Sequence, residues 1–216
     1  MPNQLKNLIK MDWTSLYFKT SNLNVFILGT GEVATRRANK FLDNGANVKL
    51  AGNDMSKELE DKGAVLCSTG EVDELVSWSD LVVVASGDNE LSEHVSNIAQ
   101  DKLINRADFP QKGDIIVPTS FNIGEIEISI FTNGKSPLMA RQLRKKIQSV
   151  ITEEDILEIE LQDYARSILK EVISDQKQRR KYLYEIFENK QINEYVKDNK
   201  IDEAKLYIDN LIRGLQ

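Results

Sequence analysis

The sequence predicts an α/β fold: a parallel sheet wound with helices, then a small β-hairpin region, then a helical carboxy-terminal domain. Between residues 22 and 105, short apolar runs alternate with helix-spaced segments, the pattern of a parallel α/β sheet. A segment of strict alternation follows Pro110, and helical periodicity continues from Thr152 onward. At roughly 150 residues per domain, 216 residues predict one large domain with a smaller appendage.

Composition indicates a folded globular chain. Apolar residues make up 41% and charged residues 29%, with a formal charge of −6, which gives no global footprint for nucleic acid. A single cysteine, Cys67, and a single histidine, His94, exclude a disulfide framework or a multi-histidine metal site within one chain. Residues 1–18 contain no uninterrupted apolar core, so we expect no signal peptide, no membrane span and a cytoplasmic protein.

The first half opens with a strand, a helix and a second strand. Residues 24–28 form a short apolar run that stops at glycine, residues 33–43 repeat at helical spacing, and residues 48–51 are again strand-like. Such a unit implies parallel strands joined by a right-handed crossover. Further strands are expected at residues 64–67, 81–85 and 103–105, with a helix at 91–100.

Beyond Pro110 the pattern changes. Residues 115–118 and 125–131 are strand-like and have no helix between them, which predicts an antiparallel hairpin turning at residues 122–124. Alternation places Ile126, Ile128 and Ile130 on one face, and we expect a partner subunit to cover it. Ser136 followed by Pro137 predicts the start of a helix. Four more helices are expected, at residues 153–173, 178–188, 191–199 and 202–214.

These patterns predict three regions with distinct roles. A Rossmann-like domain spans residues 1–113, a dimerisation region of hairpin plus helix spans residues 114–150, and a helical domain spans residues 151–216.

The strongest chemical signal is the glycine-rich turn between the first strand and helix. Residues 29–34 fit G-x-G-x-x-G/A in the strand-turn-helix context that dinucleotide binding requires. Gly29 permits the tight turn, Gly31 lets the backbone approach a pyrophosphate, and the helix start presents N–H groups. We therefore expect Gly29, Thr30, Gly31, Glu32 and Val33 to contact a cofactor. The alternative is a glycine-rich turn with no ligand.

The end of the second strand bears on which cofactor binds. Asp54, or Asn53 in its place, follows this strand where an acidic residue commonly holds the ribose of NAD. Lys57 is the nearest cation and no arginine follows closely enough to receive a 2′-phosphate. NAD is therefore favoured over NADP.

Two further segments carry polar groups that are candidates for catalysis or ligand binding. Asp108 follows the last sheet strand, where ligands of open α/β sheets bind, so its carboxylate is a candidate to accept a proton or to coordinate a divalent metal. The alternative is that Asp108 only initiates the turn before Pro110. Residues 132–137 form a polar turn before a helix start, which suits an anion. The alternative there is simple helix capping.

Four motifs carry a resemblance to a known family. They are residues 29–37 (Gly-Thr-Gly-Glu-Val-Ala-Thr-Arg-Arg), residues 85–89 (Ala-Ser-Gly-Asp-Asn), residues 105–108 (Asn-Arg-Ala-Asp) leading to 115–118 (Ile-Ile-Val-Pro), and residues 132–144. Across essentially its whole length, the chain resembles the precorrin-2 dehydrogenase and sirohydrochlorin ferrochelatase family, the amino-terminal module of siroheme synthase. Departures are Thr30 and Asn133, where the family has glycine, and Arg106-Ala107, where it has Val-Val.

The resemblance implies NAD-dependent oxidation of precorrin-2 to sirohydrochlorin by a homodimer, with insertion of ferrous iron in bifunctional members. Asp108 matches the family's key aspartate, and Ser86 and Gly87 match its cofactor-binding segment. The implied tetrapyrrole-binding residues are Asn105, Thr132, Asn133, Gly134, Lys135, Ser136 and Arg141. No bound metal, nucleic acid or membrane is implied.

Two other functions fit parts of the sequence. A non-catalytic NAD-sensing Rossmann module needs the glycine-rich turn but neither Asp108 nor the segment of residues 132–144. A dehydrogenase for a small metabolite is disfavoured, because the chain has no convincing Lys, Tyr or His constellation and no large substrate domain.

Overall fold

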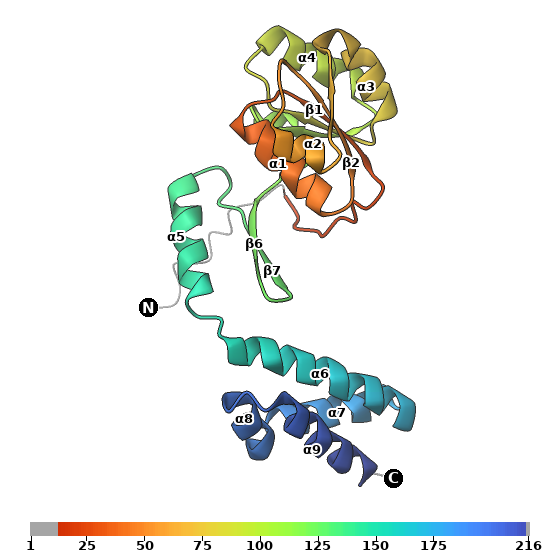
Figure 1. The fold of residues 1–216 in the computed structure, drawn as a ribbon, viewed down its shortest axis with the longest axis vertical. Coiled ribbons are helices and arrows are strands. Elements are labelled where there is room, and N and C mark those ends of the chain that lie inside the picture. Colours follow the sequence, from red (N-terminus) through yellow and green to blue (C-terminus); the bar gives the residue numbers. More distant parts are fainter. Residues whose placement is uncertain (1–12, 215–216) are drawn as a thin grey trace, which may run out of the picture. The chain divides into compact units, whose positions relative to one another are not determined.

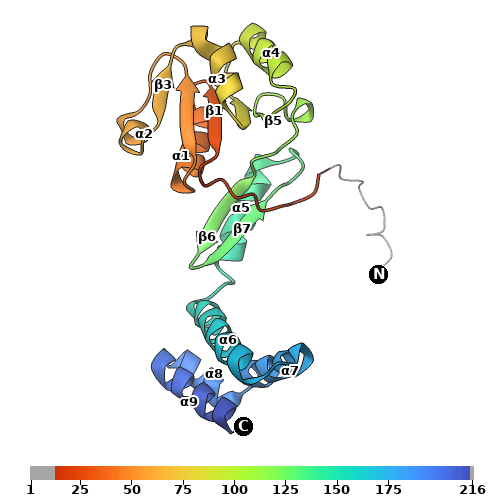
Figure 2. The same cartoon turned by 90° about the vertical axis from the view of Figure 1, so that its right-hand side faces the viewer.

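The computed structural model describes residues 13–214, which fall into two compact units dividing between Val117 and Pro118. The first unit is the parallel α/β domain (Figures 1 and 2). In chain order its elements are β1 (Asn24–Leu28), α1 (Glu32–Asp43), β2 (Asn47–Ala51), α2 (Lys57–Asp61), β3 (Val65–Cys67), η1 (Thr69–Glu71), α3 (Val72–Trp78), β4 (Leu81–Val84), α4 (Asn89–Ile98), β5 (Leu103–Arg106) and η2 (Pro110–Lys112).

All five strands run parallel in the order β3-β2-β1-β4-β5. The central strand β1 has Ile27 opposite Leu50 on one side and Val83 on the other. The chain adds β2 and β3 on one side of β1 and then β4 and β5 on its other side. Open parallel sheets bind ligands at such a change of direction, which here lies between β1 and β4. The Rossmann-like sheet predicted from the sequence is confirmed.

Helices cover both faces of the sheet, because strand residues alternate between two apolar layers (Figure 1). Val25, Ile27 and Val83 pack with α1 and α2, while Phe26 and Val84 pack with α3 and α4. The near-continuous apolar runs of β1 and β4 follow from this burial on both sides.

The second unit contains a hairpin and five helices, namely β6 (Thr119–Ile123), β7 (Ile126–Ile130), α5 (Pro137–Gln148), α6 (Glu153–Val172), α7 (Gln176–Phe187), α8 (Lys190–Lys197) and α9 (Ile201–Arg213). Helices α6 to α9 form a bundle with an apolar core, whose buried residues include Leu161, Ala165, Leu169 and Ile208. The capping serine before α5 is confirmed, since Ser136 Oγ accepts a hydrogen bond from the Met139 N–H at 3.1 Å.

One strand prediction is wrong. Residues 115–118 form no strand, and the hairpin instead pairs residues 119–123 with residues 126–130, turning at Gly124 and Glu125. Ile115 and Val117 are apolar because they pack against the sheet core of the first unit. The Ile115 carbonyl accepts a hydrogen bond from Asn105 Nδ2 at 2.9 Å, and the Val117 carbonyl accepts one from Arg37 Nη1. Ile126, Ile128 and Ile130 do share one half-buried face.

Within residues 13–214, no helix combines the length and the apolar character needed to cross a bilayer.

The bundle core yields a stability prediction from one helix. Ile208 of α9 is fully buried and Leu206, two residues earlier, is 63% exposed. Replacing Ile208 by alanine leaves a cavity, so we expect the free energy of unfolding to fall by about 2–5 kcal/mol. Leu206→Ala is expected to change it by less than about 0.5 kcal/mol. Urea unfolding followed by circular dichroism measures both, and equal losses would contradict this packing.

Candidate active site at the carboxyl edge of the sheet

The glycine-rich turn lies where the chain leaves β1. Gly29 has a φ of +114°, and a Cβ built there would lie 2.4 Å from the Ala85 carbonyl oxygen. The Gly29 N–H donates to the Ala51 carbonyl at 2.9 Å. Only glycine accommodates both the dihedral angle and the contact, so this residue holds the ends of β1, β2 and β4 close together.

Gly31 marks the start of α1 and faces open space. A Cβ built on Gly31 meets no described atom within 4 Å, and as a glycine it brings no side chain to cap the first N–H groups of the helix. Such N–H groups, together with the helix dipole, are able to receive an anion such as a pyrophosphate. The neighbouring Glu32 carboxylate is turned along the helix, because Arg36 Nη1 donates to it at 2.8 Å.

The Thr30 side chain fits because the residue that faces it, Gly52, has no side chain. A Cβ built on Gly52 would lie 2.5 Å from Thr30 Cγ2 and 2.8 Å from its Oγ1. The Thr30 side chain therefore packs directly on the backbone that follows β2. Sequence reasoning did not select Gly52, since nothing local to it signals this contact.

The other expected cofactor residues lie on loops at the same edge of the sheet. Asn53 and Asp54 follow β2, and both side chains are exposed. Ser86 and Gly87 follow β4, where Ser86 Oγ accepts a hydrogen bond from the Asp88 N–H at 3.0 Å. Because the carboxyl ends of parallel strands share one edge, these loops flank the glycine-rich turn.

Asp108 lies at this edge too, just beyond β5, and a salt bridge fixes it. Arg106 Nε donates to Asp108 Oδ1 at 2.8 Å, and Arg106 Nη2 donates to Oδ2 at 2.6 Å. The Asp108 side chain is 24% exposed and that of Arg106 only 3%. Sequence reasoning gave Arg106 no role, although its position two residues before the aspartate was visible.

The pKa of Asp108 reflects two opposing effects. Partial burial by itself raises the pKa of this carboxyl, whereas the Arg106 hydrogen bonds, the Arg106 charge and nearby backbone N–H groups lower it. The lowering effects prevail, and the pKa lies below the ordinary aspartate value. Asp108 is therefore ionised at neutral pH.

Asn105 sits on the opposite side of β5. It pairs in register with Val83, which belongs to the layer under α1 and α2. Its Nδ2 donates to the Ile115 carbonyl, and its buried Oδ1 has no hydrogen-bond partner among the described residues. The side chain thus fastens the segment that follows the sheet.

The loop before α5 belongs to the second unit. Asn133 and Gly134 are both left-handed, with φ of +55° and +71°, and Asn133, Gly134 and Lys135 are exposed. The Ser136 N–H donates to the Thr132 hydroxyl oxygen at 3.4 Å, which closes the loop. Arg141 is exposed on α5. The predicted capping of α5 by this loop is therefore observed, whereas anion binding by the loop stays a prediction.

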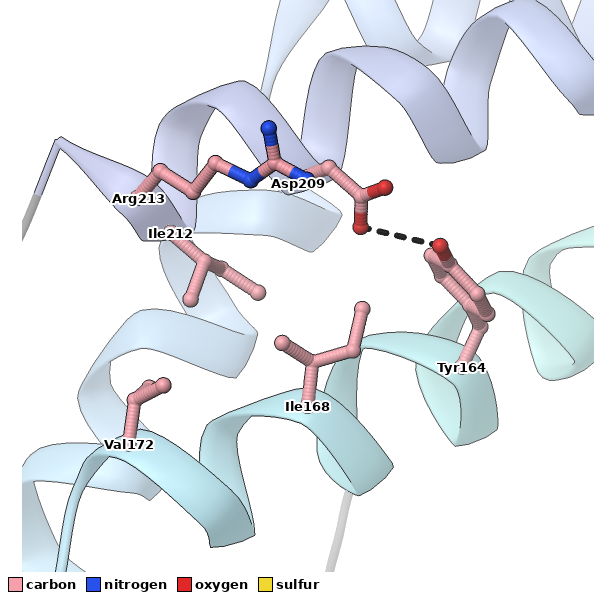
Figure 3. A pocket seen from close by; sticks show the side chains of 6 residues that line it. All are labelled: Tyr164, Ile168, Val172, Asp209, Ile212 and Arg213. Carbon is pink, nitrogen blue, oxygen red and sulfur yellow. Dashed lines mark hydrogen bonds between the residues drawn. The ribbon is translucent and has the colours of Figure 1, made fainter.

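A depression of about 390 Å³ lies between α6 and α9, and sequence reasoning did not find it. Figure 3 shows Tyr164 and Asp209 on its polar side, with Tyr164 Oη donating to Asp209 Oδ1 at 2.9 Å. This hydrogen bond is the main cause of a raised pKa for Tyr164. Its full lining is Tyr164, Ile168, Val172, Asp209, Ile212 and Arg213. None of these residues was among the expected site residues.

The cradle at Gly29 and Gly31, the open start of α1 and the sheet reversal beside it define a dinucleotide-binding protein of the Rossmann class. Residues 16–119 match a family model described as "Putative NAD(P)-binding". A precorrin-2 dehydrogenase from Methanosarcina barkeri is 30% identical over 190 residues, which cover 82% of this chain and 84% of that protein. The chain belongs to the precorrin-2 dehydrogenase family.

Two further comparisons agree with this assignment. A siroheme synthase from Actinobacillus pleuropneumoniae is 25% identical over 206 residues, covering 92% of this chain but 42% of that longer protein. The solved structure of SirC, a precorrin-2 dehydrogenase, has a TM-score of 0.74 at 23% identity and covers 92% of this chain and 100% of that one. It shows that the fold is shared.

The two glycines of the turn predict opposite behaviour on substitution. Gly29→Ala forces a Cβ into the Ala85 carbonyl, so we expect it to destabilise the first unit by about 2 kcal/mol or more. Gly31→Ala meets no protein atom, so the fold is expected to lose at most about 1 kcal/mol, whereas NAD(P) affinity falls because the methyl group occupies the approach of the pyrophosphate.

Thermal unfolding and calorimetric titration with NAD⁺ and NADP⁺ measure the two effects. A Gly31→Ala variant that binds both dinucleotides as well as the unchanged protein would contradict the cradle.

Proposed function

We propose that this chain oxidises precorrin-2 to sirohydrochlorin with NAD⁺ as the hydride acceptor, a step of siroheme biosynthesis. Family membership supports the reaction. The observation that carries the proposal is an ionised carboxylate, Asp108, at the same sheet edge as the dinucleotide cradle. A nucleotide-sensing module needs the cradle alone.

The reaction removes one hydride and one proton from precorrin-2 and yields sirohydrochlorin, NADH and a proton. NAD⁺ supplies the hydride acceptor. The Gly29–Gly31 turn and the first N–H groups of α1 hold the pyrophosphate. Asp108 carries a negative charge beside the ring system that becomes cationic as the hydride leaves.

NAD is the preferred cofactor in this proposal. Asp54 or Asn53 receives the ribose hydroxyl groups at the end of β2, and Ser86 and Gly87 border the cofactor after β4. An acidic residue at the end of the second strand disfavours the 2′-phosphate of NADP by charge repulsion.

The substrate carries several carboxylates, and the second unit offers groups that bind them. We assign this role to Lys135 and Arg141 with the polar loop Thr132, Asn133, Gly134 and Ser136 of the second unit, and we keep Asn105 of the first unit as a further candidate for binding the substrate. Insertion of ferrous iron, as a second substrate after oxidation, is a further activity to assay on the same protein.

Apolar groups exposed on the second unit support a homodimer built on residues 114–150. Leu138 is 65% exposed, Met139 49% and Val150 67%, all in or just after α5. We propose that a second copy of the chain covers these groups together with the parts of the β7 isoleucine face that stay exposed beside α5, which itself packs on that face through Arg144 and Phe121. The flanking regions, residues 1–113 and 151–216, then form the Rossmann-like and helical domains.

Asp108→Asn tests the proposed chemistry. The amide keeps the shape of the side chain but removes its charge, so we expect kcat to fall by roughly 10²- to 10⁴-fold. NAD⁺ affinity is expected to change less than about twofold, since the cradle does not include this residue. The assay follows NADH and sirohydrochlorin absorbance in anaerobic mixtures of precorrin-2 and NAD⁺.

Asp101→Asn is the matched control, because Asp101 is a well-exposed aspartate that precedes β5. If the unchanged protein binds NAD⁺ yet makes neither product while an authentic family enzyme does, the nucleotide-sensing module replaces this proposal.

The proposed dimer predicts a response to charge on α5. We expect the unchanged protein to sediment with the mass of two chains and Leu138→Glu/Met139→Glu to sediment as one, because burying carboxylates at an apolar interface is costly. Leu206→Glu, an equally exposed position on α9, is the control and is expected to stay dimeric. A monomeric unchanged protein at micromolar concentration would refute the dimer.

A further inference from the structure

Arg106 is a buried cation whose every partner is a polar side chain. It is 3% exposed and lies in register beside Val84, on the sheet face covered by α3 and α4. Beyond its two bonds to Asp108, Arg106 Nη1 donates to Ser96 Oγ at 2.8 Å and Nη2 donates to Glu93 Oε1 at 3.0 Å. A buried guanidinium is tolerated only with such pairing, so its place is closely defined.

The geometry of this pair constrains the carboxylate strongly. Nε and Nη2 of Arg106 each donate to a different oxygen of Asp108, at 2.8 and 2.6 Å. This fork-to-fork arrangement fixes both the position and the plane of the carboxylate. The guanidinium is itself immobilised by Ser96 and Glu93 on α4, so Asp108 is held against a rigid element.

We propose that Arg106 is a positioning residue for the dehydrogenation, which orients the Asp108 carboxylate and keeps it charged throughout turnover. This inference rests on the proposed function and deepens it, because it specifies how Asp108 acts. Held in this way, Asp108 stabilises positive charge on the tetrapyrrole as the hydride departs to NAD⁺. The proton lost from the substrate passes on to water and not to Asp108, the acceptor that the sequence suggested, because a carboxylate paired with Arg106 is a weak base.

The surrounding charges favour the ionised state of Asp108. Four charged groups make up the cluster: Arg106 and Asp108, with Glu93 from α4 and Lys112 from η2. Lys112 Nζ lies 3.0 Å from both Glu93 oxygens, and Lys112 and Arg106 lower the pKa of Glu93. Two positive charges thus balance two negative ones, and protonating Asp108 would leave the cluster with an excess positive charge.

The first test measures the titration of Asp108 without any assay of activity. Protein labelled with ¹³C at the aspartate carboxyl carbons is titrated by NMR, and the Asp108 signal is assigned by its loss in Asp108→Asn. We expect its midpoint in the unchanged protein to lie below the ordinary value of about 3.9. In Arg106→Val we expect it to rise relative to the unchanged protein, because the Arg106 charge and hydrogen bonds are lost and only backbone N–H groups still oppose the effect of burial.

The second test is the pH profile of kcat. With Arg106 present, we expect no acid limb above about pH 5, because Asp108 stays ionised. In Arg106→Val the limb is expected to move to higher pH, and kcat on the plateau is expected to fall by about tenfold or more because the carboxylate is no longer held in one orientation, with the KM for NAD⁺ unchanged. Arg106→Lys keeps the charge but not the bidentate fork, so an intermediate profile is expected.

Lys205→Gln is the matched control, since Lys205 pairs with Glu160 at 2.6 Å in the helical bundle, and its profile is expected to match that of the unchanged protein. A merely structural role for Arg106 would lower the melting temperature without moving the acid limb, and that result would overturn the inference. If Arg106→Val does not fold, the titration of the unchanged protein and the Arg106→Lys profile decide the matter.

The outcomes separate this inference from the proposed function. An inactive unchanged protein with a depressed Asp108 titration refutes dehydrogenation but leaves the electrostatic pair intact. An active protein whose Asp108 titrates at the ordinary value or above, or whose Arg106 variants keep the original profile, refutes the role of Arg106.

Discussion

The close approach of backbone at Gly29 is the constraint on which the site depends. With the Ala85 carbonyl 2.4 Å from where a Cβ would stand, the chain leaves β1 against the end of β4, and the Gly29 N–H is bound to the end of β2. This contact directs the following residues into α1 with the first N–H groups of the helix open. Parallel pairing of β4 with β5 then brings Asp108 to the same edge. A shift at Gly29 would separate the cradle from the carboxylate.

Much of the fold follows from short-range patterns, and these were predictable. The glycine-rich turn, the Ser136-Pro137 helix start and the alternation over β7 each depend on a few neighbouring residues. Short-range patterns did not suffice at residues 115–118, which were predicted to form a strand and do not. Its apolar residues pack on the sheet core rather than in the hairpin, and β-branched apolar residues look alike in the two settings. Only the tertiary structure distinguishes them.

The candidate site likewise contains residues that could be predicted from the sequence and residues that could not. Gly29, Gly31 and Asp108 were selected because strand ends and glycine spacing mark them locally. Gly52 and Arg106 were missed because their roles come from contacts with Thr30, Glu93 and Ser96, which lie elsewhere along the chain. In both cases the missed residue sits beside a departure from the family motif or is itself one. Departures from a motif are therefore good places to look for compensating contacts.

The packing of Thr30 on Gly52 has a consequence for how this sequence can change over generations. While Thr30 keeps its present conformation, a Cβ at position 52 would lie 2.5 Å from Thr30 Cγ2, so any larger residue there requires the threonine side chain to shift. Glycine at position 30 would remove that contact and open position 52 to other residues. The two positions are thus coupled by their contact, and the order in which substitutions arrive decides which of them is tolerated.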